Sequence, residues 1–249
     1  MSVSTTAGDA EIKIQAGGAR LGGHLLVPAG AGGIVVFVHG SGSSRHSPRN
    51  RFVARALGEA GLGTLLFDLL TPDEELDRAN VFDIRLLAGR LAEVTRWLRG
   101  TEEARHAGFG FFGASTGAAA ALWTAADVDA DVDAIVSRGG RPDLAMPRLA
   151  EVRAPTLLII GSRDDTVLEL NRAAQARLRC ENELAIVEGA THLFEEPGAL
   201  EAVADLARAW FVEHLLARGR QHPQVDPVVA SDLDQARPSR RPQGELSHG

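Results

Sequence analysis

The chain has 249 residues, of which 45% are hydrophobic, and this is enough to bury the core of one large domain. Its formal net charge of -7 argues against nucleic acid and anionic membrane as partners, because the field of an acidic protein attracts neither of them. Cys180 is the only cysteine, which excludes an internal disulfide and a cysteine-based metal site.

The sequence shows no pattern of an N-terminal targeting segment or of a membrane helix. The N-terminus has no basic start followed by an apolar core, and no window approaches the roughly 20 apolar residues of a membrane helix. We therefore expect a cytoplasmic protein. Residues 219–249 contain four prolines and few large apolar residues, so we expect a disordered tail there and one domain over residues 1–218.

The chain opens with two segments of partial alternation, residues 10–15 and 19–28, which predict an antiparallel pair of strands at a sheet edge. After them, short apolar runs recur without polar alternation, as is typical of strands buried on both faces. These runs are residues 34–40, 63–70, 108–113, 133–140, 155–161 and 183–189.

Between the apolar runs lie segments with helical spacing of apolar residues, at 52–60, 84–98 and 198–216. Strands that alternate with helices imply right-handed crossovers and a mainly parallel sheet with helices on both faces. The sequence therefore predicts an α/β fold whose functional groups gather at the C-terminal ends of the strands.

The stretch "GFFGASTG" places Ser115 between two glycines where an apolar run meets an alanine-rich segment. A sharp strand-to-helix turn brings backbone segments together, so Gly113 and Gly117 supply space that a larger residue would fill. We expect Ser115 to be a nucleophile at the start of a helix. The alternative is a serine that only caps that helix.

A serine nucleophile needs a base, and in this architecture an acid and then a histidine follow it on later strand ends. Asp164 follows the run at 155–161, and His192 follows the run at 183–189. The acid has two alternatives, because Asp165 is adjacent and Asp68 lies at another strand end. Asp165 could instead cap a helix, and Asp68 fits a residue that fixes its loop by hydrogen bonds.

The oxyanion formed during attack on a carbonyl needs two N–H donors. The residue after the nucleophile should supply one, from Thr116, and the loop after the run at 34–40 should supply the other, from Ser41. Gly40 and Gly42 leave that loop free to present its N–H groups inward.

With these motifs, "HGSGSS", "GASTG", "GSRDDTV" and "GATHLF", the chain resembles an α/β-hydrolase over about residues 10–217, and more narrowly the dienelactone-hydrolase-related group. The resemblance implies Asp164 as the acid, by the family pattern G-x-x-D counted from Gly161, and His39 as a residue that bonds the oxyanion loop. Dienelactone hydrolases themselves use a cysteine nucleophile where this chain has Ser115. Members of the group are sometimes fused to a phosphoribosyltransferase domain, and this chain has no length for one.

The expected activity is hydrolysis of small to medium carboxylic esters, or of related lactones or thioesters, with a small-molecule substrate and without a cofactor. Only about 14 residues separate the runs at 133–140 and 155–161, so we expect no large cap domain. The histidine spacing gives no support for a metal site. A ligand-binding or regulatory module that lacks turnover is the alternative function.

Two arginine-rich stretches, "SSRHSPRNR" and "SRGGRPD", follow strand ends. If Arg45 or Arg138 faces the pocket, its guanidinium could bind a substrate carboxylate in bidentate fashion. The alternative is that these are solvated loop arginines or partners of Asp143. The oligomeric state does not follow from the sequence.

Overall fold

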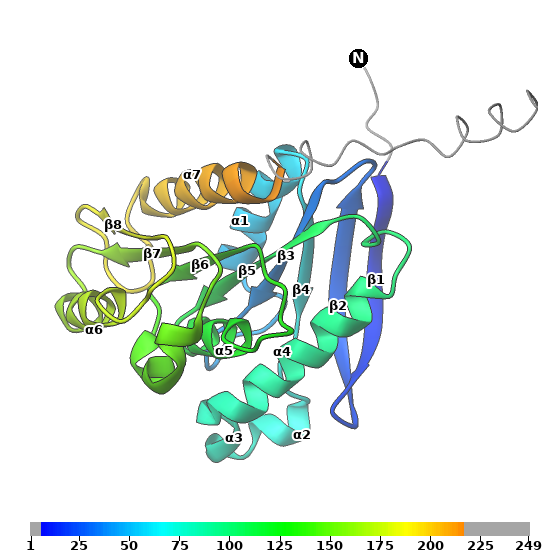
Figure 1. The fold of residues 1–249 in the computed structure, drawn as a ribbon, viewed down its shortest axis with the longest axis horizontal. Helices are drawn as coiled ribbons and strands as arrows, with labels where there is room; N and C mark the ends of the chain where they lie inside the picture. The colour runs from blue at the N-terminus through cyan, green and yellow to red at the C-terminus, as the bar shows by residue number, and fades with distance from the viewer. Residues whose placement is uncertain (1–5, 217–249) are drawn as a thin grey trace, which may run out of the picture.

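The computed structural model describes residues 6–216, and the tail predicted at 219–249 lies outside the described residues. The core is an eight-stranded sheet with strand order β1-β2-β4-β3-β5-β6-β7-β8 (Figure 1). The first two strands pair antiparallel with their neighbours, and the others are parallel to one another. The strands are β1 (Thr6–Ala16), β2 (Ala19–Pro28), β3 (Gly33–Val38), β4 (Gly63–Phe67), β5 (Gly108–Ala114), β6 (Ala134–Arg138), β7 (Thr156–Gly161) and β8 (Asn182–Val187).

All eight predicted strands are present, and the α/β class and mostly parallel sheet are confirmed. The hairpin of β1 and β2 turns at Gly17 and Gly18, whose φ angles of 53° and 77° suit the tight turn that joins two twisted strands. Strands β3, β4 and β6 are buried along their whole length, which explains their unbroken apolar sequences.

The expectation for residues 183–189 was wrong in one respect. Strand β8 pairs only with β7 and forms the edge of the sheet, and Val187 is its only buried residue among 182–187. Its sequence is apolar at Leu184, Ala185 and Ile186 without being buried on both faces, and Ile186 is 44% exposed.

Helices cover both faces of the sheet (Figure 1). Apolar residues of α1 and α7 pack on one face, and those of α4, α5 and α6 pack on the other. The predicted closing helix is α7 followed by a π-helical turn at Val212–Leu216. The five helices that pack on the sheet are α1 (Pro48–Glu59), α4 (Ile84–Arg99), α5 (Thr116–Ala125), α6 (Asp165–Gln175) and α7 (Ala199–Phe211).

The segment between β6 and β7 contains only a 3₁₀ helix at Pro142–Glu151, so no cap domain is inserted there, as expected. Two short helices, α2 (Pro72–Glu75) and α3 (Arg78–Phe82), lie between β4 and α4 instead. None of the helices in residues 6–216 is both long and apolar enough to span a bilayer.

Candidate active site

Ser115 lies at the turn from β5 into α5, in the nucleophile elbow formed by residues 113–117. Its backbone has φ 50° and ψ -120°, a conformation that L-residues other than glycine seldom adopt. A Cβ at Gly117 would collide with the carbonyl oxygen of Val38, and one at Gly113 would collide with the backbone of Ala118. Glycine is therefore required on both sides of Ser115, for the close approach inferred from the sequence.

The backbone around Ser115 is fixed by the ends of two neighbouring strands. Its N–H donates to the carbonyl of Arg138 at 3.3 Å, and its carbonyl accepts the N–H of Arg141 at 3.1 Å. On the opposite side, Gly40, in the loop just after β3, lies so close that a Cβ there would be 2.9 Å from Cβ of Ser115. The side chain of Ser115 is thus held at the C-terminal edge of the sheet.

Asp164 and His192 are brought together by the loops that follow β7 and β8. The His192 Nδ1 and Asp164 Oδ2 atoms are 2.6 Å apart, and the Asp164 side chain is only 15% exposed. The N–H of Arg163 donates to the carbonyl of Ala190 at 2.9 Å, which ties the two loops together. If Nδ1 donates to the carboxylate, Nε2 of the ring is left as the basic nitrogen.

His192 also lies beside the loop that holds Ser115. A Cβ at Gly139 would be 3.4 Å from Nδ1 of His192, so this glycine packs directly against the imidazole. The φ of Gly139 is 52°, where a side chain would add strain to that contact. The loop after β6 therefore touches both Ser115 and His192.

The two alternative acids have other surroundings. Asp165 is the exposed first residue of α6, after Asp164 at the N-cap position, and it does not cap the helix. Asp68 accepts the backbone N–H of Arg45 at 2.9 Å and also pairs with the Arg45 guanidinium. Asp68 therefore fixes a loop, as the sequence suggested.

The guanidinium of Arg45 has carboxylate partners within the protein. Its guanidinium pairs with Asp68, and its Nε lies 3.5 Å from a carboxylate oxygen of Glu11 on β1. Two carboxylates already surround this cation, so it is an ion-pairing residue in the structure.

The two residues expected to form the oxyanion hole are in contact. The N–H of Ser41 donates to Oγ1 of Thr116 at 2.9 Å, so both lie at the start of α5. His39 fixes the same loop: its Nδ1 lies 3.0 Å from the carbonyl of Gly40, and its Nε2 accepts the N–H of Leu69 at 3.1 Å. Burial lowers the pKa of His39 below its usual 6.5, in keeping with a neutral ring that accepts an N–H.

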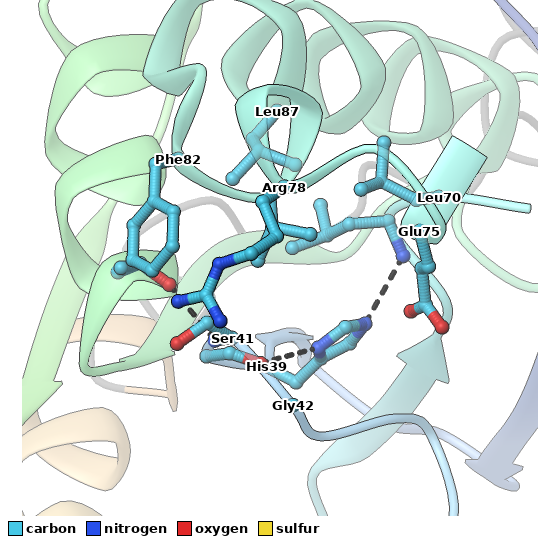
Figure 2. Close-up of a pocket in the computed structure, with 12 residues that line it drawn as sticks. His39, Ser41, Gly42, Leu70, Glu75, Arg78, Phe82 and Leu87 are labelled. Carbon is cyan, nitrogen blue, oxygen red and sulfur yellow. Dashed lines mark hydrogen bonds between the residues drawn. The ribbon is translucent and has the colours of Figure 1, made fainter.

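A cavity of about 350 Å³ opens beside this loop. It is bordered by Ser41 and Thr116 on one side and by the segment of α2 and α3 on the other, and Figure 2 shows Arg78 and Phe82 extending toward it. The sequence analysis missed this wall. The apolar residues that α3 contributes to the lining are Val81 and Phe82, in a segment that is mostly polar and shows no clear helical periodicity.

Arg138, at the end of β6, is the most unusual charged residue of the site. It is 7% exposed, and its Nε and Nη1 are buried without a hydrogen-bond partner among the described residues. Burial, and secondarily the neighbouring Arg49, lowers the pKa of Arg138 to about 10, so it remains a cation at neutral pH. The partner of Asp143 is instead Arg141, through two hydrogen bonds of 2.8 Å.

The loop that carries His192 is held by hydrogen bonds to Glu196. The carboxylate of Glu196 accepts the N–H and the hydroxyl of Thr191, next to His192, at 3.1 and 2.7 Å. These hydrogen bonds lower the pKa of Glu196.

Within the described part of the chain, no group of three potential ligands could hold a metal ion.

An α/β-hydrolase is the class that this sheet order and the turn at Ser115 define. Among solved structures, the dienelactone hydrolase from Anabaena variabilis is 52% identical to this chain and has a TM-score of 0.81. The match covers 84% of this chain and 98% of that one. The chain belongs to the dienelactone-hydrolase-related group of the α/β-hydrolase superfamily.

Other comparisons agree on the fold. Est1E from Butyrivibrio proteoclasticus is 15% identical to this chain and has a TM-score of 0.71. The match covers 83% of this chain and 99% of Est1E.

A Mycobacterium tuberculosis H37Rv protein that bears the name "Putative phosphoribosyl transferase" is 60% identical over 211 residues, which are 85% of this chain. This chain spans only 48% of that relative, so the name describes a protein about twice as long. No family model matches the chain.

Proposed function

We propose that this hydrolase is a serine-dependent carboxylic ester hydrolase, with Ser115 as nucleophile, His192 as base and Asp164 as the acid that orients His192. The observation that carries the proposal is the 2.6 Å contact between Nδ1 of His192 and Oδ2 of Asp164, on loops tied to the elbow. The strained backbone of Ser115 supports it, because such strain is typical of nucleophiles held for reaction.

The reaction follows from these roles. Ser115 Oγ attacks the ester carbonyl carbon while Nε2 of His192 takes the hydroxyl proton, and Asp164 stabilises the imidazolium that forms. The backbone N–H groups of Thr116 and Ser41 stabilise the oxyanion, and for Ser41 this means giving up or sharing its hydrogen bond to Oγ1 of Thr116. His192 then protonates the leaving alkoxide. Water, deprotonated by the same ring, releases the acid from the acyl-enzyme.

The cavity beside Ser41 and Thr116 favours an ester with a small to medium apolar part. The apolar lining of the cavity is formed by Leu70, Val81, Phe82 and Leu87. Its volume also admits a lactone or a thioester of similar size. The relative from Anabaena variabilis carries the name dienelactone hydrolase, so lactones belong in the first substrate panel.

The proposal is tested by intact-mass analysis after treatment with a fluorophosphonate, which reports an activated serine without a chosen substrate. We expect one adduct on the wild-type chain and none on Ser115→Ala. A folded wild-type protein that gains no adduct would contradict the proposal and favour a binding module that lacks turnover. A positive result leads to a panel of short-chain esters, lactones and thioesters.

A further inference from the structure

Asn171, on α6, is a fully buried polar residue that has no role in the reaction proposed above. Its Nδ2 donates to the carbonyl of Gly140 at 3.0 Å and to the carbonyl of Val167, one turn earlier in the helix, at 2.8 Å. Both partners are acceptors, so only one orientation of the amide fits, with the NH₂ group toward them. Asn171 therefore joins α6 to the loop that follows β6.

The oxygen of the same amide is left unpaired. Oδ1 of Asn171 is buried and accepts no hydrogen bond from the described residues. A buried acceptor without a donor lowers the stability of a protein. An apolar residue at this position would instead leave the carbonyl of Gly140 without its donor, so an amide gains little stability over it. What the amide adds is a fixed link between the helix and the loop.

The loop after β6 is in contact with two members of the proposed triad. The N–H of Arg141 donates to the carbonyl of Ser115 at 3.1 Å. Gly139 packs against the imidazole of His192. Gly140, whose carbonyl accepts the amide, lies between these two contacts in the chain. A shift of Gly140 would therefore move both of them.

The third member of the triad is attached to the helix that carries the amide. Asp164 is the N-cap residue of α6, and its carbonyl accepts the N–H of Leu168 at 2.8 Å. Asn171 lies about two helical turns beyond Asp164, so the two residues share one face of α6. Through this helix, the amide fixes where the acid lies relative to the loop that contacts Ser115 and His192.

We propose that Asn171 is a positioning residue of the active site. Its amide holds the loop after β6 at a fixed distance from α6, and the ring of His192 thereby stays aligned between Asp164 and Ser115. This inference rests on the proposed function for the identity of the triad. Asn171 does not line the cavity described above, so it acts on the alignment of the reacting groups and not on substrate binding.

The rate at which a fluorophosphonate modifies the chain reports this alignment, because the reaction needs the serine and its base together. We expect Asn171→Ala to lower that rate by about 10- to 100-fold, as for a displacement of a reacting group by about 1 Å. On an ester that the wild-type enzyme cleaves, kcat should fall in the same proportion while KM stays nearly unchanged. A wild-type modification rate in folded Asn171→Ala would overturn the proposal.

Ala174→Gly is the matched control. Ala174 is fully buried about one turn further along α6, and glycine there weakens the helix without removing a hydrogen bond to the loop. The melting temperature of this variant should fall, while its modification rate should stay near the wild-type value. An equal loss of rate in Ala174→Gly and Asn171→Ala would show that weakening of α6 alone explains the effect, and the positioning role would be refuted.

Asn171→Ser separates the two hydrogen bonds and also serves if Asn171→Ala folds poorly. A serine hydroxyl can donate to the carbonyl of Val167 in its own helix, but it is too short to reach Gly140. We therefore expect Asn171→Ser to be more stable than Asn171→Ala and to be modified as slowly. If Asn171→Ser reacts at the wild-type rate, the hydrogen bond to Gly140 does not position the site, and the proposal is wrong.

Proton NMR tests the alignment without turnover. The Nδ1 proton of His192, in its short contact with Asp164, should give a low-field resonance, identified by its loss in Asp164→Ala. We expect Asn171→Ala to shift or broaden this resonance and Ala174→Gly to leave it unchanged. If the wild-type chain gains no fluorophosphonate adduct, the proposed function fails, and the resonance still decides whether Asn171 aligns His192. An unchanged resonance in Asn171→Ala would exclude that role.

Discussion

Ser115 and Asp164 differ from their neighbours in local geometry more than in chemical type. Serine is common in the chain, yet Ser115 combines a positive φ with glycines that cannot be replaced without collision. Two adjacent aspartates follow β7, yet only Asp164 contacts the imidazole of His192. At this scale, the role of a residue follows from the direction in which the backbone points its side chain.

The pair of aspartates provides a prediction with an internal control. Asp164→Asn should lower kcat by about 10³- to 10⁴-fold, because an amide stabilises the imidazolium poorly and favours the wrong tautomer of His192. Asp165→Asn should keep kcat near the wild-type value, since Asp165 is an exposed residue at the start of α6. Steady-state kinetics on a short-chain ester would measure both. Similar losses in the two variants would refute Asp164 as the acid.

At the scale of elements, the strands and the catalytic loops could be predicted from the sequence, and the cavity wall could not. Buried parallel strands have unbroken apolar runs, and the turn at Ser115 has its own glycine spacing, so both are local signals. The edge position of β8 depends on sheet order, which no local pattern records. The short helices α2 and α3 are polar, and their position depends on a long-range contact with α4.

That contact is made by Arg90, a 4% exposed residue of α4. Its Nη2 lies 2.5 Å from Glu74 of α2, and its Nη1 donates to the carbonyl of Ala16 at the end of β1. Glu74 also accepts the N–H of Thr71 at 2.8 Å, in the capping box of α2. One buried guanidinium thus joins the first hairpin, α4 and the wall of the cavity.

Arg90→Met should therefore lower the free energy of unfolding by about 1 to 3 kcal/mol, because it leaves the buried carbonyl of Ala16 without this donor and removes the ion pair of the half-buried Glu74. It should also raise KM for esters that fill the cavity, since α2 loses its attachment. Urea denaturation and steady-state kinetics measure these effects. Arg96→Met, on the exposed side of the same helix, is the control.

The double variant Arg90→Met/Glu74→Gln tests the origin of the effect. It should be destabilised by less than the sum of the single variants, since both changes remove the same contact. Strict additivity would mean that Arg90 stabilises the protein mainly through Ala16 and by packing.

At the scale of the whole molecule, two hydrophobic cores lie on opposite faces of the sheet, and the site lies at the edge where the parallel strands end. His39 joins the ends of β3 and β4 at that edge, through the carbonyl of Gly40 and the N–H of Leu69. Because Nε2 of His39 accepts the N–H of Leu69, the ring must be neutral. Protonation of Nε2 would place a second N–H against the N–H of Leu69. Global stability is therefore coupled to the protonation of one ring.

The sign of this coupling follows from the lowered pKa. In the unfolded chain, His39 takes up a proton as the pH falls through about 6.5, while the buried ring of the folded protein stays neutral to a lower pH. The unfolded state then binds more protons, so the free energy of unfolding decreases as the pH falls. Above about pH 7.5, both states are neutral, and His39 contributes no pH dependence.

We therefore expect the wild-type protein to lose stability between about pH 7 and pH 5, with a contribution from His39 that approaches about 1.4 kcal/mol per pH unit. His39→Asn should be less stable at pH 7, because Asn cannot span both partners, but its stability should depend less on pH. The other histidines are common to both proteins and cancel in the difference. Urea denaturation across this range measures both slopes, with His46→Asn, at an exposed position, as the control. Identical slopes of the free energy of unfolding against pH for wild type and His39→Asn would mean that the folded protein protonates His39 as readily as the unfolded chain does. The inference that a neutral His39 holds the oxyanion loop would then be wrong.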